Sequence, residues 1–144
     1  METTWNIYWN DYGFKSYLYG SKIVFNNKDV SFSNKLMSPG AVIKVWYSKV
    51  NFQGMKTEPT LPMVDGENSY NLSRDIDTNG DNLIIRIVFF DRYENELESL
   101  IMREDSFDFK CPIKTYSYQI ELINAGVANF VFHKLVLKEF SNEG

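Results

Sequence analysis

The stretch "DIDTNGDN", which begins at Asp75, spaces oxygen-bearing side chains as a calcium-binding loop does. In a helix-loop-helix calcium site the first, third and fifth positions would be Asp75, Asp77 and Asn79. The twelfth position should hold a bidentate acid, but here it is the cation Arg86. Such a loop also needs flanking helices, whereas the residues on both sides favour strands. The sequence therefore predicts no metal, and a weak lectin-style cation site at the same residues is the alternative.

The Asn79-Gly80 pair inside this stretch is typical of a two-residue turn, because both residues tolerate a positive φ. It lies between "SYNLSRDI" (69–76), which alternates, and "LIIRIVFF" (83–90), which is apolar on both faces except at Arg86. We expect these two runs to be strands joined as a hairpin. We also expect Arg86 to pair with a carboxylate from an adjacent strand or to reach an edge of the sheet.

Catalytic chemistry would depend on His133, the single histidine, which lies between Phe132 and Lys134 in a strand-like run. A Ser-His-Asp or Cys-His arrangement would have to be built on it. Cys111 precedes Pro112 at the end of an expected strand, a common place for a buried, inert thiol. The sequence has no nucleophile elbow, phosphate-binding glycine loop or pair of histidines. We predict neither catalysis nor a cofactor; a small enzyme would need His133 exposed in a polar cleft.

Sugar binding is a further possibility, because exposed aromatic rings stack on pyranose faces while amide and charged side chains bond the hydroxyls. Residues of these types lie along one long expected strand and at the end of another: Trp46, Asn51 and Gln53, and Asp91, Arg92 and Tyr93. They could share a concave face that contacts a glycan. In the alternative interpretation, Trp46 and Tyr47 belong to the core, and Asp91 with Arg92 only closes a turn.

The elements that must position these residues are strands. The 144-residue chain is 16% aromatic, with four Pro and eight Gly, which suits pleated strands more than helices. Other strand-like runs are "KIVFNNKDVSF", read as a hairpin, "AVIKVWYSKVNFQ", "TYSYQIEL" and "NFVFHKLVLKEF". "ENELESLIM" is favoured as a strand that returns from a turn after Phe90. We predict one all-β domain over residues 1–144, a jelly-roll β-sandwich of two antiparallel sheets.

Composition also limits the partners and the location. The formal net charge of −4 argues against nucleic acid or an acidic membrane as the main partner. One Cys cannot form an internal disulfide, so oxidising export is not required. No stretch approaches about 20 apolar residues, and the opening "METTWNIYWNDYG" lacks the basic and apolar regions of a signal peptide. We therefore expect a cytoplasmic protein that does not span a membrane.

Several short motifs resemble one bacterial family. They are "NIYW" followed by "SYLYGSKIVF", then "LMSPGAVIKVWYSKVNFQ", "PTLPMV" and "IVFFDR", between about Ile7 and Arg92. "YGS", "MSPG", "NFQ" and "FFDR", in this order, resemble the third accessory secretory protein of the accessory Sec system. The likeness is weaker after Tyr93, because a glycine is expected in the turn after Arg92 and the chain reads Tyr93-Glu94-Asn95. The final "YSYQIELINAGVANFVFHKLVLKE" is similar to the closing strands of carbohydrate-binding modules in general.

The resemblance implies a carbohydrate-binding-module-like, non-enzymatic subunit in the cytoplasm of Gram-positive bacteria or peripheral to the inner face of the membrane. It implies assembly with the other two accessory secretory proteins, one glycosyltransferase-like and one acetyltransferase-like. It also implies that the complex engages a glycosylated serine-rich-repeat adhesin and delivers it to the accessory Sec motor ATPase. The alternative is a stand-alone carbohydrate-binding module or an appendage of a glycoside hydrolase, for which secretion would be expected.

An assembly subunit should use exposed apolar or aromatic side chains at strand edges and loops to bind its protein partner. The candidates lie in the stretches that carry the resemblance, with the last one just beyond them: Tyr17, Tyr19, Met37, Trp46, Phe52 and Tyr93. The sequence leaves open which face binds protein and which, if either, binds glycan.

Overall fold

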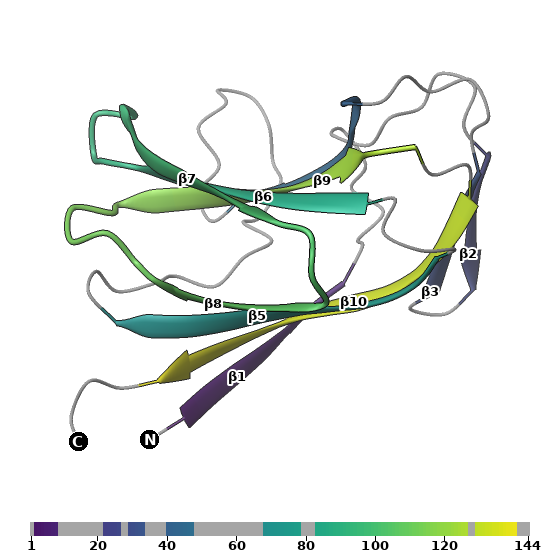
Figure 1. The fold of residues 1–144 in the computed structure, drawn as a ribbon, viewed down its shortest axis with the longest axis horizontal. Coiled ribbons are helices and arrows are strands. Elements are labelled where there is room, and N and C mark those ends of the chain that lie inside the picture. Colours follow the sequence, from purple (N-terminus) through teal and green to yellow (C-terminus); the bar gives the residue numbers. More distant parts are fainter. Residues whose placement is uncertain are drawn as a thin grey trace.

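The computed structural model describes residues 2–8, 22–26, 29–33, 40–47, 68–78, 83–126 and 129–140. In these residues ten strands form two antiparallel sheets that lie one above the other (Figure 1). The larger sheet has the order β2-β3-β10-β5-β8, and β1 pairs with β10. The smaller sheet has the order β4-β9-β6-β7. The predicted all-β sandwich is confirmed, and the described residues include no helix that could cross a membrane.

The strands of the larger sheet are β1 (Glu2–Ile7), β2 (Lys22–Asn26), β3 (Asp29–Ser33), β5 (Ser69–Thr78), β8 (Ser106–Lys110) and β10 (Asn129–Phe140). Those of the smaller sheet are β4 (Val42–Tyr47), β6 (Leu83–Phe90), β7 (Glu96–Met102) and β9 (Ser117–Asn124). β10 is the longest of these and pairs with β5 along one side and with β1 and β3 along the other.

The core lies between the two sheets and is rich in aromatic rings, as the composition indicates. Trp46 of the smaller sheet stacks on Phe132 of the larger one, with ring centroids 5.5 Å apart. Phe89 and Phe109 make a second contact between the sheets at 5.9 Å. Because strand side chains alternate between faces, every second residue supplies this core. Burying these large rings removes much apolar surface from water and holds the two sheets together.

Two hairpin predictions are confirmed and one is wrong. β2 pairs with β3, and β7 returns beside β6 as a strand. β5 and β6, however, lie in different sheets, so the chain crosses between the layers after Thr78 instead of forming a hairpin. The edges of β5 are filled by β8 and β10, and those of β6 by β7 and β9. A local Asn-Gly turn signal cannot specify which strands pair with the two edges of β5. Here they are β8 and β10, which lie further along the chain than β6.

A buried arginine ties the larger sheet to the beginning of the smaller one. Arg74 of β5 projects from the apolar row between Leu72 and Ile76, and its side chain is only 3% exposed. Its guanidinium donates to the carbonyl oxygens of Leu83 at 2.8 Å and Arg103 at 3.3 Å. It also pairs with the exposed carboxylate of Asp105 at 3.2 Å. One side chain thus connects β5, the first residue of β6 and the β7–β8 connection.

The expected partner of Arg86 is found on the neighbouring strand. Arg86 of β6 lies directly opposite Glu121 of β9, and the two side chains form an ion pair. The Nε of Arg86 donates to Oε1 of Glu121 at 2.7 Å, and Gln119 donates to the other carboxylate oxygen at 2.5 Å. The side chain of Glu121 is 7% exposed and that of Arg86 is 40% exposed. Pairing is confirmed, but the buried member is the acid rather than the arginine.

We expect Arg74→Ala to lower the free energy of unfolding by about 2–3 kcal/mol, because it leaves two backbone carbonyl oxygens without their charged donor. Chemical denaturation of the wild type and the variant measures this difference. Arg103→Ala is the matched control: it removes an exposed arginine side chain from the same region and should change stability by less than about 0.5 kcal/mol. Equal effects of the two substitutions would contradict the connecting role of Arg74.

We expect Arg86→Ala to cost about 2–3 kcal/mol, because Glu121 would keep its buried charge without a cationic partner. The double variant Arg86→Met with Glu121→Leu should regain most of this loss, since apolar residues of similar size often replace such pairs at little cost. Both changes are read from denaturation midpoints. If the double variant is less stable than Arg86→Ala, the ion pair stabilises the sheet by more than the cost of leaving Glu121 unpaired.

Candidate functional site

The turn between β6 and β7 carries three of the candidate residues, Asp91, Arg92 and Tyr93. The Asp91 carboxylate accepts hydrogen bonds from the backbone N–H of Tyr93 at 2.8 Å and of Asn95 at 3.0 Å. These bonds, led by the one from Asn95, lower the pKa of Asp91. Arg92 is exposed, and Tyr93 is 78% exposed. Asp91 therefore closes the turn, as one alternative predicted, while Arg92 and Tyr93 remain accessible.

The same turn contains the position at which the resemblance predicts a glycine. The resemblance leads us to expect a glycine after Arg92, and Glu94 instead adopts a φ of 68° in this turn. That conformation is strained for a residue with a Cβ, and glycine adopts it freely. The backbone bond from Glu94 N–H to Asp91 C=O at 3.0 Å and the two bonds to the Asp91 carboxylate hold the turn in this shape.

The loop between β8 and β9 lies beside this turn at the left of Figure 1. The N–H of Tyr116 donates to the C=O of Phe90 at 2.8 Å, and Lys114 is close enough to contribute to the lowered pKa of Asp91. Tyr93, Ile113 and Tyr116 are three of the five large apolar side chains that are exposed in the described part of the chain. We call these three residues the turn-end surface. They lie on two segments that the bond from Tyr116 N–H to Phe90 C=O holds together.

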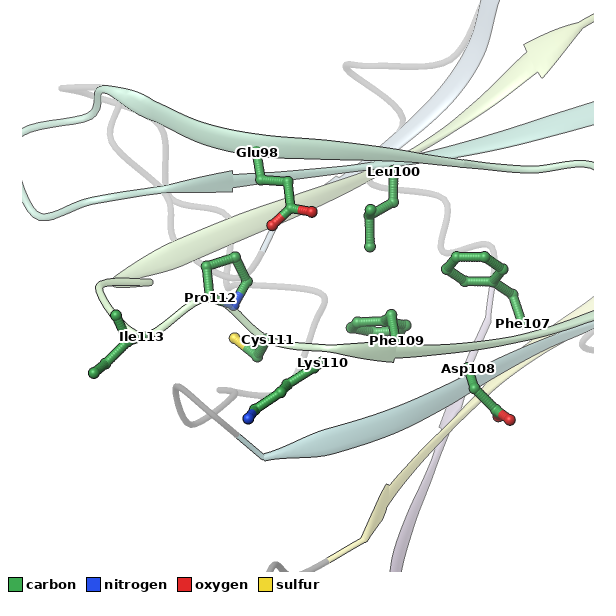
Figure 2. A pocket seen from close by; sticks show the side chains of 9 residues that line it. All are labelled: Glu98, Leu100, Phe107, Asp108, Phe109, Lys110, Cys111, Pro112 and Ile113. Carbon is green, nitrogen blue, oxygen red and sulfur yellow. The ribbon is translucent and has the colours of Figure 1, made fainter.

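A cleft of about 490 Å³ opens next to this surface, between β7 and β8 (Figure 2). These are the outermost strands of the smaller and the larger sheet in the described residues, so the cleft lies at the open side of the sandwich. Leu100 from β7 and Phe107 and Phe109 from β8 form its apolar walls, and Cys111 and Pro112 continue it toward the β8–β9 loop. Figure 2 shows Glu98 and Leu100 pointing from β7 toward β8, and Asp108 and Lys110 pointing away from β7.

Trp46 corrects one of the predictions. Its side chain is fully buried, it stacks on Phe132, and its indole N–H donates to the carbonyl oxygen of Tyr8 at 3.0 Å. A ring in this position cannot contact a partner or a glycan, because the strand alternation turns it into the core. The core interpretation of Trp46 is therefore the right one. The other candidates lie outside the described residues: Tyr17, Tyr19, Met37, Asn51, Phe52 and Gln53.

The calcium-like stretch is described only in part. Asp75 and Asp77, the first and third positions of such a loop, lie at the end of β5, so the residues before Asp75 form a strand where a calcium site needs a helix. Residues 79–82 lie outside the described residues. Within the described residues, no group of three or more acidic, His or Cys side chains could hold a metal ion. The turn interpretation of the stretch stays a prediction.

His133 lies between two carboxylates. It occupies the register shift of β10 between Phe132 and Lys134. Its Nδ1 is 2.8 Å from Asp29 of β3 and its Nε2 is 2.9 Å from Asp77 of β5. These bonds, first that to Asp77 and then that to Asp29, raise the pKa of His133 to about 9. The protonated ring then donates from both nitrogens, which leaves no nitrogen free to accept a proton from a substrate.

Two antiparallel sheets around an aromatic core place the chain among β-sandwiches of the carbohydrate-binding-module type. A part with this fold occurs in a solved chain that holds the CBM22-1 and GH10 modules of the Clostridium thermocellum endo-1,4-beta-D-xylanase 10B complexed with xylohexaose. The alignment has a TM-score of 0.56 and 17% identity, and it covers 96% of this chain and 28% of that one. This likeness concerns the fold alone.

Closer relatives identify the family. The family model described as accessory Sec secretory system ASP3 matches residues 16–139. The accessory Sec system protein of the same name from Streptococcus gordonii is 39% identical over 130 residues, which is 89% of this chain and 82% of the relative. The chain therefore belongs to the accessory Sec secretory system ASP3 family, as its motifs indicated.

Solved structures agree with this membership. A chain in the crystal structure of accessory secretory proteins 1, 2 and 3 from Streptococcus pneumoniae aligns with a TM-score of 0.89 and 32% identity, covering 94% of this chain and 96% of that one. A chain in the Glycosylation Associate Protein (Gap123) complex from Streptococcus agalactiae aligns with a TM-score of 0.89 and 35% identity. That alignment covers 97% of this chain but only 46% of the other.

The arrangement around His133 leads to a pH dependence. Since its pKa rises from about 6.5 when unfolded to about 9 when folded, its contribution to stability should be complete below about pH 6.5. It should decline as the pH rises from there through 9. The free energy of unfolding, measured by denaturation between pH 6 and pH 10, should fall for the wild type across this interval. His133→Gln should remove that part of the slope, and an unchanged slope would show that other groups cause it.

Proposed function

We propose that the chain is a non-enzymatic subunit that assembles with the two other accessory secretory proteins. One observation carries the proposal: the fold matches, over 94% of the chain, a protein whose structure contains accessory secretory proteins 1, 2 and 3 together. The likeness to a chain of the Gap123 complex supports it from a second species. The state of His133 agrees with a binding role, since a doubly bonded imidazolium cannot act as a general base.

The finer parts of the proposal rest on the family. The complex engages a glycosylated serine-rich-repeat adhesin in the cytoplasm, at the inner face of the membrane, and delivers it to the accessory Sec motor ATPase. The chain takes part as one domain over residues 1–144, and its own chemistry is recognition rather than bond breaking. The sheet pairing between β1 and β10, which joins the two ends of the described chain, supports a single folded unit.

The turn-end surface is the best described candidate for the contact with a protein partner. Tyr93 presents a ring on a turn that is held by backbone and side-chain hydrogen bonds, so little conformational entropy is lost when it is buried. Rigid aromatic side chains of this kind are enriched at binding hot spots. Ile113 and Tyr116 add neighbouring apolar area from a second segment.

We expect Tyr93→Ala to keep the fold and weaken the binding of accessory secretory proteins 1 and 2 by about 30-fold, the equivalent of about 2 kcal/mol for a hot spot. Its thermal midpoint should stay close to that of the wild type, because the side chain is exposed. Affinity is measured by titration of the purified partners, and the midpoint by circular dichroism.

Ile101→Ala is the control for this experiment, since it removes an exposed apolar side chain from β7 outside the turn-end surface. It should leave the affinity unchanged. If Tyr93→Ala and Ile101→Ala both bind as the wild type does, the contact lies elsewhere on the chain. If the wild type binds neither partner but binds a free oligosaccharide tightly, the stand-alone carbohydrate-binding module is the right interpretation.

A further inference from the structure

The cleft between β7 and β8 has an unusual combination of walls. Phe107 and Phe109 stack with ring centroids 6.2 Å apart, and Leu100 faces them from the other sheet. Phe109 is almost fully buried, whereas Phe107 and Leu100 are only partly covered. An aromatic and aliphatic surface is therefore accessible from the open side of the sandwich. A volume of about 490 Å³ is within the range of clefts that take a ligand or a partner's side chain.

Glu98 places a negative charge at this apolar surface. It lies opposite the buried Phe89 in the register of β6 and β7, so it projects from the inner side of β7 (Figure 2). No hydrogen bond or ion pair joins its carboxylate to any residue in the described ranges. Lys110 lines the same cleft but points away from β7. The cleft thus combines an apolar wall, a stacked pair of rings and a carboxylate with no cationic partner among the described residues.

We propose that this cleft binds an arginine side chain of the protein partner, an inference that rests on the proposed function. The planar guanidinium can stack on the half-buried Phe107 ring, and its fork of N–H donors matches the Glu98 carboxylate. The aliphatic stem of the arginine then covers Leu100. Arginine fits better than lysine because its weakly hydrated, flat cation makes both contacts at once, while an ammonium is a compact and strongly hydrated charge.

An inward-pointing acid on an outermost strand also has a purely structural explanation. Such charges prevent the edge strands of two molecules from pairing. That explanation predicts that neutralising Glu98 changes self-association and leaves the affinity for the partner proteins unaltered. The arginine proposal predicts the opposite, so the two can be separated by measuring both properties on the same variants.

The decisive comparison is Glu98→Gln against Glu96→Gln. Both remove one acid from β7, but Glu96 is opposite Phe90 and does not line the cleft. The affinity of each variant for accessory secretory proteins 1 and 2 is titrated from about 0.05 M to about 0.5 M salt. Glu98→Gln should bind at least about tenfold more weakly at low salt and with a shallower salt dependence. Glu96→Gln should bind as the wild type does, and Glu98→Arg should bind more weakly than Glu98→Gln, because like charges repel.

The stacking part is tested with Phe107→Leu, which keeps an apolar wall but removes the ring; it should weaken binding by a few-fold without a change in the salt dependence. Sedimentation of every variant reports self-association. If the wild type binds the partner proteins and Glu98→Gln and Glu98→Arg bind them with the same affinity, the cleft proposal is wrong and the assembly proposal stands. A wild type that binds neither partner protein would overturn both.

Discussion

The pairing of β10 determines much of the remaining architecture. This strand bonds to β5 along one side and to β1 and β3 along the other, while β8 takes the second edge of β5. Because a strand has only two hydrogen-bonding edges, β5 has none left for β6. The chain crosses to the other layer after β5, where β6 pairs with β7 and β9, and it crosses back between β7 and β8. As a result β7 and β8, neighbours in the sequence, are the outermost described strands of different sheets, with a cleft between them.

The two crossings come close together at Arg74. Its guanidinium bonds to the first residue of β6 and to the β7–β8 connection, so it links the segment after the first crossing to that of the second. On the opposite face of the larger sheet, His133 joins β3, β10 and β5 through two carboxylates at the register shift of β10. The shift also changes which residues face the core, from Phe130 and Phe132 to Leu135 and Leu137. Polar contacts thus fix the register at the places where apolar packing alone would allow a slip.

The sequence predicts the strands and the fold class well, because alternation and aromatic content reflect burial at every residue. It predicts their partners less well, since the Asn79-Gly80 pair describes only a local turn and the choice of partner depends on strands far away in the chain. Arg74 carried a usable signal: it interrupts the apolar row between Leu72 and Ile76, as Arg86 interrupts "LIIRIVFF". Its partners were beyond prediction, because two of them are backbone carbonyl oxygens that any residue could supply.

The candidate site shows the same limit. Aromatic type alone could not separate the buried Trp46 from the exposed Tyr93, because both suit a strand-rich chain and only the pleat and the turn decide which faces water. Nothing in the sequence indicates a binding role for Glu98, because an acid in "ENELESLIM" is expected to be an ordinary solvated charge. Only the structure shows that its side chain points toward the opposite sheet.

The turn-end surface and the cleft meet at the β8–β9 loop, which supplies Ile113 to the first and Pro112 to the second. The loop is held at both ends, by the bond from Cys111 N–H to Asn68 C=O at 3.0 Å and by that from Tyr116 N–H to Phe90 C=O at 2.8 Å. A partner that covers the exposed rings therefore approaches the cleft with its position already restricted. Covering the exposed rings affects the free energy of binding at the cleft. A single ion pair in water contributes little to that free energy, whereas one enclosed by an apolar contact is screened much less. In the proposed contact, the apolar surface would supply the exclusion of water that makes a charge at Glu98 selective.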